Sequence, residues 1–450
     1  MDDTQTFRSR TKHVNIETNR DQLTVHREKA VLVGVELPEH PWITEDPLDE
    51  LRGLVKTAGA SIVGELTQRR KYIETATYIG KGKVQELADL AQANDADVII
   101  FDNDLHANQT RNLEEATKIK VLDRSELIMD IFATRARTTE ARLQVELAQL
   151  EYSLPRLKNM WTHLSRYKGG IGLRGPGETQ LEEDRRLVDT RIRDLKQRLR
   201  EVEARKQREV SSRREEHTVS LVGYTNAGKS TLMNALTGAD VYVENKLFST
   251  LDTRTRQWKI KNWGRILLSD TVGFIRHLPH RLVTSFKATL EEARQARLLL
   301  HVVDASNPTA VEQMQAVDQV LKELDCGDKP TIMVLNKIDQ ASPDLLADCR
   351  NAAGARHCVT VSAAQRKGLD ELSDAVVEVL TKDFVEAEIT ADAGNGKMLA
   401  YLAVHAEIHH QEFRDQKVHV HCHLPRYLLH HLEEPGIEVK VNGTLVNGTH

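Results

Sequence analysis

The most informative stretch of the chain is Gly223-Tyr-Thr-Asn-Ala-Gly-Lys-Ser230. Its spacing matches the P-loop pattern G-x-x-x-x-G-K-[ST], whose glycines let backbone N–H groups approach phosphate oxygens. We expect Lys229 to reach the outer phosphates of a nucleotide and the Ser230 hydroxyl to ligate Mg²⁺. Apolar residues 218–222 predict a buried strand before the loop and residues 230–236 a helix after it. The predicted strand before the loop and helix after it argue against a chance match to the pattern.

A second motif, Asp270-Thr-Val-Gly273, supports a site for a nucleoside triphosphate. It follows the apolar run 266–268, which predicts a strand ending at the motif. Ligands of such sheets bind at the carboxyl ends of the strands. We therefore expect Asp270 to join the Mg²⁺ shell and the N–H of Gly273 to face the γ-phosphate.

The base is indicated by Asn336-Lys-Ile-Asp339, which follows the apolar run 331–335, and by Ser362-Ala363, which follows residues 357–361. Asp339 can accept hydrogen bonds from N1–H and the N2 amino group of guanine, whereas adenine has no such donor pair. A site built around such bonds rejects the analogue lacking them by about 10⁴–10⁵. Because the motifs occur in this order at strand ends, we predict a guanine-nucleotide domain.

Composition indicates a helix-rich soluble protein of several domains. The chain has 450 residues, 29% of them charged and 4% aromatic, and a net charge of −5. It contains no apolar run of the roughly 18 residues that a membrane span needs, and its first 29 residues are polar. Four scattered cysteines without a CxxC motif suggest reduced thiols. We expect a cytoplasmic protein, and leave open a partly peripheral membrane location.

The predicted fold class is α/β, in five segments. Residues 1–29 form a polar, disordered tail, and 30–137 an N-terminal α/β domain with a parallel sheet. Residues 138–215 form an antiparallel helical hairpin, 216–383 the P-loop G domain, and 384–450 a small α+β domain. In the N-terminal domain, strands at 31–37, 61–66, 97–102 and 120–122 alternate with helices, which indicates a parallel sheet.

One N-terminal motif, Ile79-Gly-Lys-Gly-Lys83, allows two interpretations. It lacks the full spacing of a P-loop or a dinucleotide-binding loop, so a glycine turn that opens a helix is the simpler one. The alternative is a second nucleotide site, which would make the chain an NTP-driven RNA remodelling module.

The hairpin is predicted from apolar residues at steps of three and four on both sides of a glycine-rich loop at 168–178. Residues 135–216 carry 20 Lys and Arg against 14 Asp and Glu, a net charge of +6 in an acidic chain. Such a segment indicates contact with a polyanion, and Lys168 and Arg174 at the tip are candidate RNA contacts. The alternatives are a permissive connector at the tip and a solvated helical face.

In the last segment we expect strands at 398–409, 417–424 and 437–441 and a short helix at 426–432. His419, His421 and His423 alternate with apolar residues, so all three lie on one face of a strand. A polar outer face is the simpler interpretation, because no second set of metal ligands has a recognisable spacing.

Several motifs together resemble the HflX family of ribosome-associated GTPases. They are the P-loop with Thr231, Phe248-Ser-Thr-Leu-Asp252, Asp270-Thr-Val-Gly-Phe-Ile-Arg-His-Leu-Pro279 and Gly169-Gly-Ile-Gly-Leu-Arg-Gly-Pro-Gly-Glu-Thr-Gln180. Residues 144–150 and 78–83 match as well, so the resemblance covers about residues 30–383. It implies binding to the large ribosomal subunit and a role in splitting or rescuing stalled ribosomes.

The resemblance also implies residue roles. Thr250 would be the switch I threonine that closes over the γ-phosphate and completes the Mg²⁺ shell. Ras-like GTPases place a glutamine after the Asp-x-x-Gly motif to orient water. Phe274 cannot do this, so hydrolysis should be slow or should depend on a cation or a partner. Asn226 fits the pattern by which relatives hold K⁺, although a loop asparagine in an unusual backbone conformation explains it equally well.

The predicted site residues fall into three groups. The catalytic group is Lys229, Thr250 and Gly273. The metal group is Ser230, Thr250 and, through the second shell, Asp270. The GTP-binding group comprises Gly223, Tyr224, Thr225, Asn226, Ala227, Gly228, Lys229, Ser230, Thr231, Phe248, Ser249, Thr250, Leu251, Asp252, Asp270, Thr271, Val272, Gly273, Asn336, Lys337, Ile338, Asp339, Ser362, Ala363 and Ala364.

The prediction as a whole is a monomeric GTPase that uses Mg²⁺, and K⁺ if Asn226 has the role described. Its partners would be GTP, GDP and the 50S subunit with its 23S rRNA. A large-subunit assembly factor with the same switch is the nearest alternative. A tRNA-modification enzyme with an attached G domain is less favoured, because no folate, iron–sulfur or methyl-donor signature is present outside the G domain.

Overall fold

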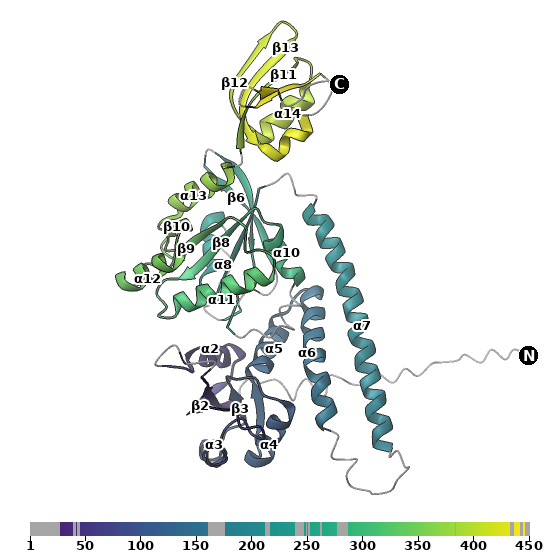
Figure 1. Cartoon of the computed structure of the whole chain (residues 1–450), viewed down its shortest axis with the longest axis vertical. Coiled ribbons are helices and arrows are strands. Elements are labelled where there is room, and N and C mark those ends of the chain that lie inside the picture. The colour runs from purple at the N-terminus through teal and green to yellow at the C-terminus, as the bar shows by residue number, and fades with distance from the viewer. Residues whose placement is uncertain are drawn as a thin grey trace, which may run out of the picture. The chain divides into compact units, whose positions relative to one another are not determined.

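The structure is a computed structural model that describes residues 28–38, 42, 46–160, 176–211, 217–238, 247–248, 250, 253–261, 263–276, 287–382, 384–432, 436–441 and 444–445. The chain divides into two compact units. One comprises Met1–Thr134 and Gln149–Val188, the other Arg135–Ala148 and Asp189–His450. Each unit is described by itself. Element labels follow Figure 1.

The N-terminal sheet is parallel, with strand order β2-β1-β3-β4. Its central strand β1 is buried almost throughout, as expected when helices cover both faces of a parallel sheet. Val31, Val33 and Val35 pack against α3 and α4 on one face. The elements are β1 (Lys29–Glu36), α2 (Asp49–Ala58), β2 (Ser61–Arg69), α3 (Lys81–Ala93), β3 (Val98–Phe101), α4 (Ala107–Thr117), β4 (Lys120–Asp123) and α5 (Arg124–Arg135).

Two long helices, α6 (Thr139–Met160) and α7 (Pro176–Ser211), form the predicted hairpin and run side by side in Figure 1. Near its base, Leu147 on α6 and Leu195 and Leu199 on α7 belong to the predicted apolar seam and are buried. Arg191 donates two hydrogen bonds to the Glu146 carboxylate across the pair, at 2.8 and 3.0 Å. The predicted RNA contacts at positions 168 and 174 lie outside the described residues.

The third sheet has strand order β10-β9-β8-β5-β7-β6, and only the β6–β7 pair is antiparallel. Neighbouring residues of β9 separate into two cores. Ile332 and Val334 pack with α8 and α13, while Met333 and Leu335 pack with α11 and α12. Since successive side chains of a strand point to opposite faces, these helix pairs cover opposite faces of the sheet.

The elements of this domain begin with β5 (Thr218–Gly223), α8 (Lys229–Thr237), β6 (Arg254–Ile260), β7 (Gly264–Asp270), α10 (Lys287–Gln295) and β8 (Leu298–Asp304). They continue with α11 (Ala310–Glu323), β9 (Thr331–Asn336), α12 (Pro343–Ala353), β10 (Cys358–Thr360) and α13 (Leu369–Thr381). The carboxyl ends of β5, β7 and β9 carry the three predicted nucleotide-binding motifs.

The C-terminal sheet has strand order β12-β13-β11-β14-β15 and is antiparallel. Its elements are β11 (Phe384–Asp392), α14 (Gly396–His405), β12 (Glu407–Arg414), β13 (Lys417–Pro425), the 3₁₀ helix η2 (Arg426–Leu432), β14 (Glu438–Val441) and β15 (Thr444–Leu445). The predicted α/β fold class, with its three kinds of sheet domain and the helical hairpin, is confirmed.

The prediction of a strand over residues 398–409 is wrong. A helix, α14, occupies most of this range, and the strand β12 begins only at Glu407. The Asn395 side chain accepts a hydrogen bond from the N–H of Met398 at 3.0 Å and so caps the helix. Met398 and Leu402, one helical turn apart, are both buried in the domain core. The cap and this spacing stabilise a helix where apolar content alone suggested a strand.

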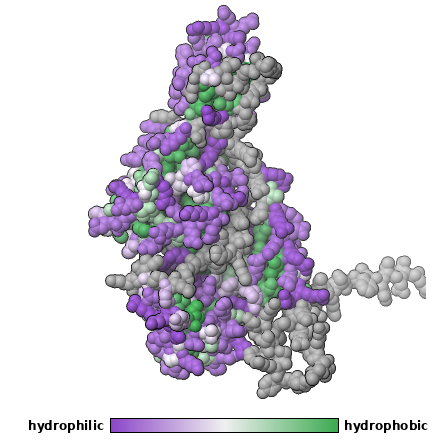
Figure 2. Space-filling model, in the orientation of Figure 1, coloured by the Kyte–Doolittle hydropathy of each residue, from purple (hydrophilic) through white to green (hydrophobic). Residues whose placement is uncertain are grey.

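None of the described helices is both long and apolar enough to cross a membrane. The face of the molecule in Figure 2 is mostly hydrophilic where the structure describes it, with hydrophobic side chains in separate patches.

Candidate nucleotide site

The loop between β5 and α8 has the backbone shape that a phosphate-binding loop needs. Gly223 and Gly228 have φ angles of +147° and +94°, which residues other than glycine rarely adopt. A Cβ atom at Gly223 would lie 2.2 Å from the Val302 carbonyl oxygen, and one at Gly228 would lie 2.3 Å from Nδ2 of Asn336. Both glycines are therefore required by the fold of the loop itself.

Lys229, the first residue of α8, is buried beneath this loop. Its Nζ donates to the carbonyl oxygens of Gly223 and Tyr224 at 3.0 and 2.8 Å. Burial lowers the pKa of Lys229 to about 8, while the nearby Asp270 opposes the shift. A phosphate next to the ammonium group would supply the opposite charge that its buried position lacks.

Three oxygen-bearing side chains meet beside the lysine. The Ser230 Oγ donates to Oδ2 of Asp270 at 2.6 Å and lies 2.7 Å from the Oγ1 of Thr250. Thr250 donates to the same Oδ2 at 3.1 Å. The other oxygen, Oδ1, is buried, and no described residue hydrogen-bonds to it. Burial raises the pKa of Asp270. Hydroxyl and carboxylate oxygens are the ligands Mg²⁺ prefers, so this cluster fits a magnesium ion.

The segment after β7 is tied to the P-loop by backbone hydrogen bonds. The N–H of Phe274 donates to the Gly223 carbonyl at 3.1 Å, and the N–H of Thr225 donates to the Phe274 carbonyl at 2.7 Å. A Cβ at Gly273 would lie 2.7 Å from the Cα of Thr225, so only glycine allows this approach. The ring of Phe274 is buried. It offers no polar atom for orienting a water molecule.

The end of the site predicted to bind the base is organised by Asn336, which is buried at the end of β9. Its Nδ2 donates to the carbonyl of Ala227 at 2.9 Å, and its Oδ1 accepts from the N–H of Ala363 at 3.0 Å. One side chain thus joins the P-loop to the loop after β10. The Ser362 hydroxyl donates to Oδ1 of the exposed Asp339 at 2.5 Å. This hydrogen bond lowers the pKa of Asp339, so its carboxylate stays ionised and can accept hydrogen bonds.

These parts enclose a pocket of about 340 Å³. It is lined by the predicted residues Thr225, Asn226, Gly228, Lys229, Ser230, Thr231, Phe248, Thr250, Gly273, Asn336, Lys337, Asp339, Ala363 and Ala364. Gln340 lines it too and was missed by the sequence reasoning, although it directly follows Asp339. Its Nε2 donates to Oδ2 of Asp339 at 3.3 Å.

The other predicted residues lie elsewhere. Tyr224, Ala227, Thr271, Val272 and Ser362 are buried and do not line the pocket. Ile338 is half-buried, does not line it either, and donates its N–H to the Val361 carbonyl at 3.4 Å. The predicted site positions 249, 251 and 252 lie outside the described residues. Among these supporting residues, Thr271 donates to the Leu221 carbonyl at 2.7 Å and so holds β7 beside β5.

The N-terminal motif at 79–83 forms the turn that opens α3. Gly80 is the N-cap residue, and its N–H donates to Oε1 of Gln68 at 3.2 Å. The ammonium group of Lys83 pairs with the Glu86 carboxylate at 2.8 Å. These contacts match the simpler interpretation of the motif, a glycine turn at a helix start.

Together, the strand–loop–helix unit, its buried lysine, the hydroxyl–carboxylate cluster and the Asp339 carboxylate define a P-loop GTPase. Residues 45–133 match the family described as GTP-binding GTPase N-terminal, 135–213 its middle region, and 218–337 the 50S ribosome-binding GTPase family. Among curated proteins, GTPase HflX of Caldanaerobacter subterraneus subsp. tengcongensis is 43% identical over 405 residues, or 89% of this chain and 92% of the relative. GTPase HflX of Escherichia coli (strain K12) is 45% identical over 377 residues, or 82% and 87% of the two chains.

The chain belongs to the HflX family of GTPases, and it is a GTPase. A solved GTP-binding protein from Sulfolobus solfataricus in complex with GDP aligns with 79% of this chain and 99% of its own at 25% identity. Its TM-score of 0.42 is too low to establish a shared overall arrangement.

Proposed function

We propose that this GTPase binds the 50S ribosomal subunit in its GTP form and acts in splitting or rescuing ribosomes during translation. The observation that carries the proposal is the contact of Thr250 with both Ser230 and Asp270. Thr250 comes from a segment 20 residues beyond Ser230 and is held in the same oxygen cluster. The state of the nucleotide can therefore control the position of this segment.

Each site residue then has a role. Lys229 neutralises charge on the outer phosphates, and Gly273 directs its backbone toward the γ-phosphate. Ser230 and Thr250 would hold Mg²⁺ directly and Asp270 through its outer shell, and the ion would neutralise phosphate charge. Asp339 accepts from guanine while Ser362 holds its carboxylate in place.

The missing water-orienting side chain makes hydrolysis dependent on the partner. Phe274 is buried and apolar, so this chain alone should hydrolyse GTP slowly. Contact with the 50S subunit would supply or order the missing group. Asn226 is exposed at the pocket with a φ of +61°, a conformation that asparagine tolerates well. A role for its side chain in holding K⁺ remains our proposal.

The partner surface is proposed to be the basic hairpin. We place the domain boundaries at 30–137, 138–215, 216–383 and 384–450, with the hairpin as the second of these segments. Its tip, with Lys168 and Arg174, would contact 23S rRNA, because basic loops bind RNA through phosphates and base edges. The chain would act as a monomer.

Sedimentation of cell lysate with a non-hydrolysable GTP analogue tests this proposal. We expect the protein to migrate with mature 50S and 70S particles in the presence of the analogue and to leave them with GDP. Enrichment with precursor particles would instead support a role in large-subunit assembly. Migration free of ribosomal particles in both states would contradict ribosome binding.

A further inference from the structure

The outer face of the C-terminal sheet carries an unusual number of imidazoles. Along β13, Val418, Val420 and Cys422 are buried in the domain core, whereas His419, His421 and His423 alternate with them on the other face. The neighbouring strand β12 pairs with β13 and adds His409 and His410. Some of these side chains converge on one point.

The point of convergence lies at a β-bulge in β12. Glu407 pairs with His423, and Ile408 pairs with Cys422, but the next pair joins His410 to His421. His409 is therefore the extra residue of the bulge, with no partner of its own in the ladder. Glu407 and His409 are two residues apart and so lie on the same face of β12, the face on which Glu407 pairs with His423. The bulge leaves His409 near both His421 and His423, with ring centroids 6.0 and 6.2 Å away.

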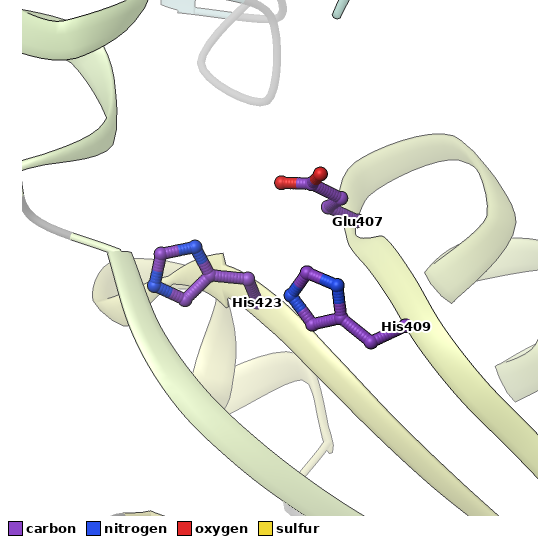
Figure 3. Close-up of side chains that lie close together, drawn as sticks. All are labelled: Glu407, His409 and His423. Carbon is purple, nitrogen blue, oxygen red and sulfur yellow. The ribbon is translucent and has the colours of Figure 1, made fainter.

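The resulting trio has the dimensions of a metal site. One ligand atom from each of Glu407, His409 and His423 lies within 4.8 Å of the others. Figure 3 shows the two imidazole rings side by side, with the carboxylate of Glu407 turned to the same side of the sheet. Ligands of tetrahedral zinc at about 2.0–2.1 Å lie about 3.4 Å apart. Glu407 and His409 are exposed and His423 is half-buried, so modest side-chain rotations close this gap.

The other histidines of β13 have partners outside the trio. Nε2 of His421 lies 3.1 Å from Oε1 of Glu386 on β11, and Nδ1 of His419 lies 3.0 Å from the hydroxyl of Thr390. Within the described part of the chain, no other group of three His, Cys, Asp or Glu side chains has its ligand atoms within 4.8 Å of one another.

We propose that Glu407, His409 and His423 bind a divalent transition-metal ion of the Zn²⁺ class, with water in the remaining coordination position. Two imidazoles and one carboxylate form a ligand set typical of zinc, and imidazole suits zinc, nickel and copper far better than magnesium. Bound there, the ion joins β12 to β13 at the bulge. Because the trio lies on the exposed face, its open position is accessible to a ligand from a partner. This site is independent of GTP hydrolysis.

Titration of the full-length protein with Zn²⁺ tests the proposal. Calorimetry should be carried out with GDP and excess Mg²⁺ present, so that the nucleotide site is already filled. We expect one Zn²⁺ per chain. Loss of a residue just outside a metal's ligands costs about 10–100-fold in affinity, so His409→Ala with His423→Ala should cost at least this much. Co²⁺ in place of Zn²⁺ should give the visible absorption of tetrahedral coordination.

The matched control is His410→Ala with His419→Ala, which removes two imidazoles from the same domain but spares the trio. This variant should bind Zn²⁺ like the unmodified chain. A third variant, Glu407→Gln, removes the carboxylate at constant size and should weaken binding even if the double variant folds poorly. The proposal would be overturned by an equal loss of Zn²⁺ affinity in the control or by unchanged affinity in Glu407→Gln. Failure of the unmodified chain to bind one Zn²⁺ would also overturn it.

Discussion

The nucleotide pocket and the helical hairpin use polar residues in opposite ways. In the pocket, Lys229, Asp270 and Asn336 are buried, and protein atoms already hold them in place. On the hairpin, most of the described polar side chains of α7 are exposed, and residues 135–216 carry a net charge of +6. A preorganised pocket selects one small ligand by geometry, whereas a solvated basic arm attracts a large polyanion with little geometric demand. Changes in the hairpin should therefore spare nucleotide affinity, whereas the nucleotide state of the pocket should still control binding of the partner.

The largest expected effect is on base choice. Asp339→Asn replaces an acceptor by a donor, so guanine loses two hydrogen bonds and xanthine gains a partner. We expect kcat/KM for GTP to fall by about 10⁴ and preference to shift to xanthosine triphosphate. Asp348→Asn is the matched control, because it makes the same substitution at an exposed carboxylate of α12 that does not line the pocket. Unchanged kcat/KM for GTP in Asp339→Asn would show that another residue selects the base.

The second effect concerns the Thr250 hydroxyl and its contribution to GTP hydrolysis on 50S subunits. Thr250→Ala removes a hydroxyl from the cluster with Ser230 and Asp270. We expect GDP affinity to change little, whereas GTP hydrolysis on 50S subunits should fall about 100-fold, since a metal ligand contributes several kcal/mol. Thr250→Ser keeps the hydroxyl and should recover most of the rate. If alanine and serine behave alike, the hydroxyl is not a ligand.

The third prediction concerns the hairpin tip alone. Replacing residues 169–177 by a short Gly-Ser turn should leave GTP affinity intact and weaken 50S binding at least tenfold. Neutralising Lys168 and Arg174 should also reduce the slope of log K against log salt, by about 0.7–0.9 for each phosphate that the variant no longer neutralises. Binding of 50S subunits by filtration at several salt concentrations measures both effects. If the shortened variant binds 50S subunits as tightly as the unmodified chain, the tip is only a connector.

The smallest effect is a pH dependence of stability. Burial lowers the pKa of Lys229 to about 8 from its ordinary value of 10.5. Between these values the unfolded chain binds more protons than the folded one, so stability of the nucleotide-free protein rises with pH from about 8 to 10.5. One such group contributes at most about 1.4 kcal/mol per pH unit. Lys229→Met should flatten this part of the slope in urea unfolding. An identical slope in both proteins would show that the lysine is not buried as described.

The two regions also differ in what the sequence could reveal. The pocket was predictable because its residues occur in short motifs at strand ends, and parallel topology brings those ends together. The same motifs could not show that Asn336 joins two loops through its side chain. That contact depends on the tertiary packing of segments more than one hundred positions apart.

The C-terminal domain shows where sequence patterns fail. The helix α14 was predicted as a strand, because its apolar residues outweighed the cap at Asn395. Alternation along β13 correctly placed three histidines on one face, but it could not locate ligands on β12. The bulge at His409 changes the register by one residue, and such a shift leaves no mark in the spacing of polar and apolar residues.

The most direct test of the central proposal is the affinity of the purified protein for purified 50S subunits in its two nucleotide states. A coupling between the pocket and the partner surface predicts tighter binding with a non-hydrolysable GTP analogue than with GDP, by about 5–150-fold. Binding can be followed by light scattering or filtration at fixed salt and Mg²⁺. Equal affinity in the two states would contradict a GTP-controlled ribosome-binding switch.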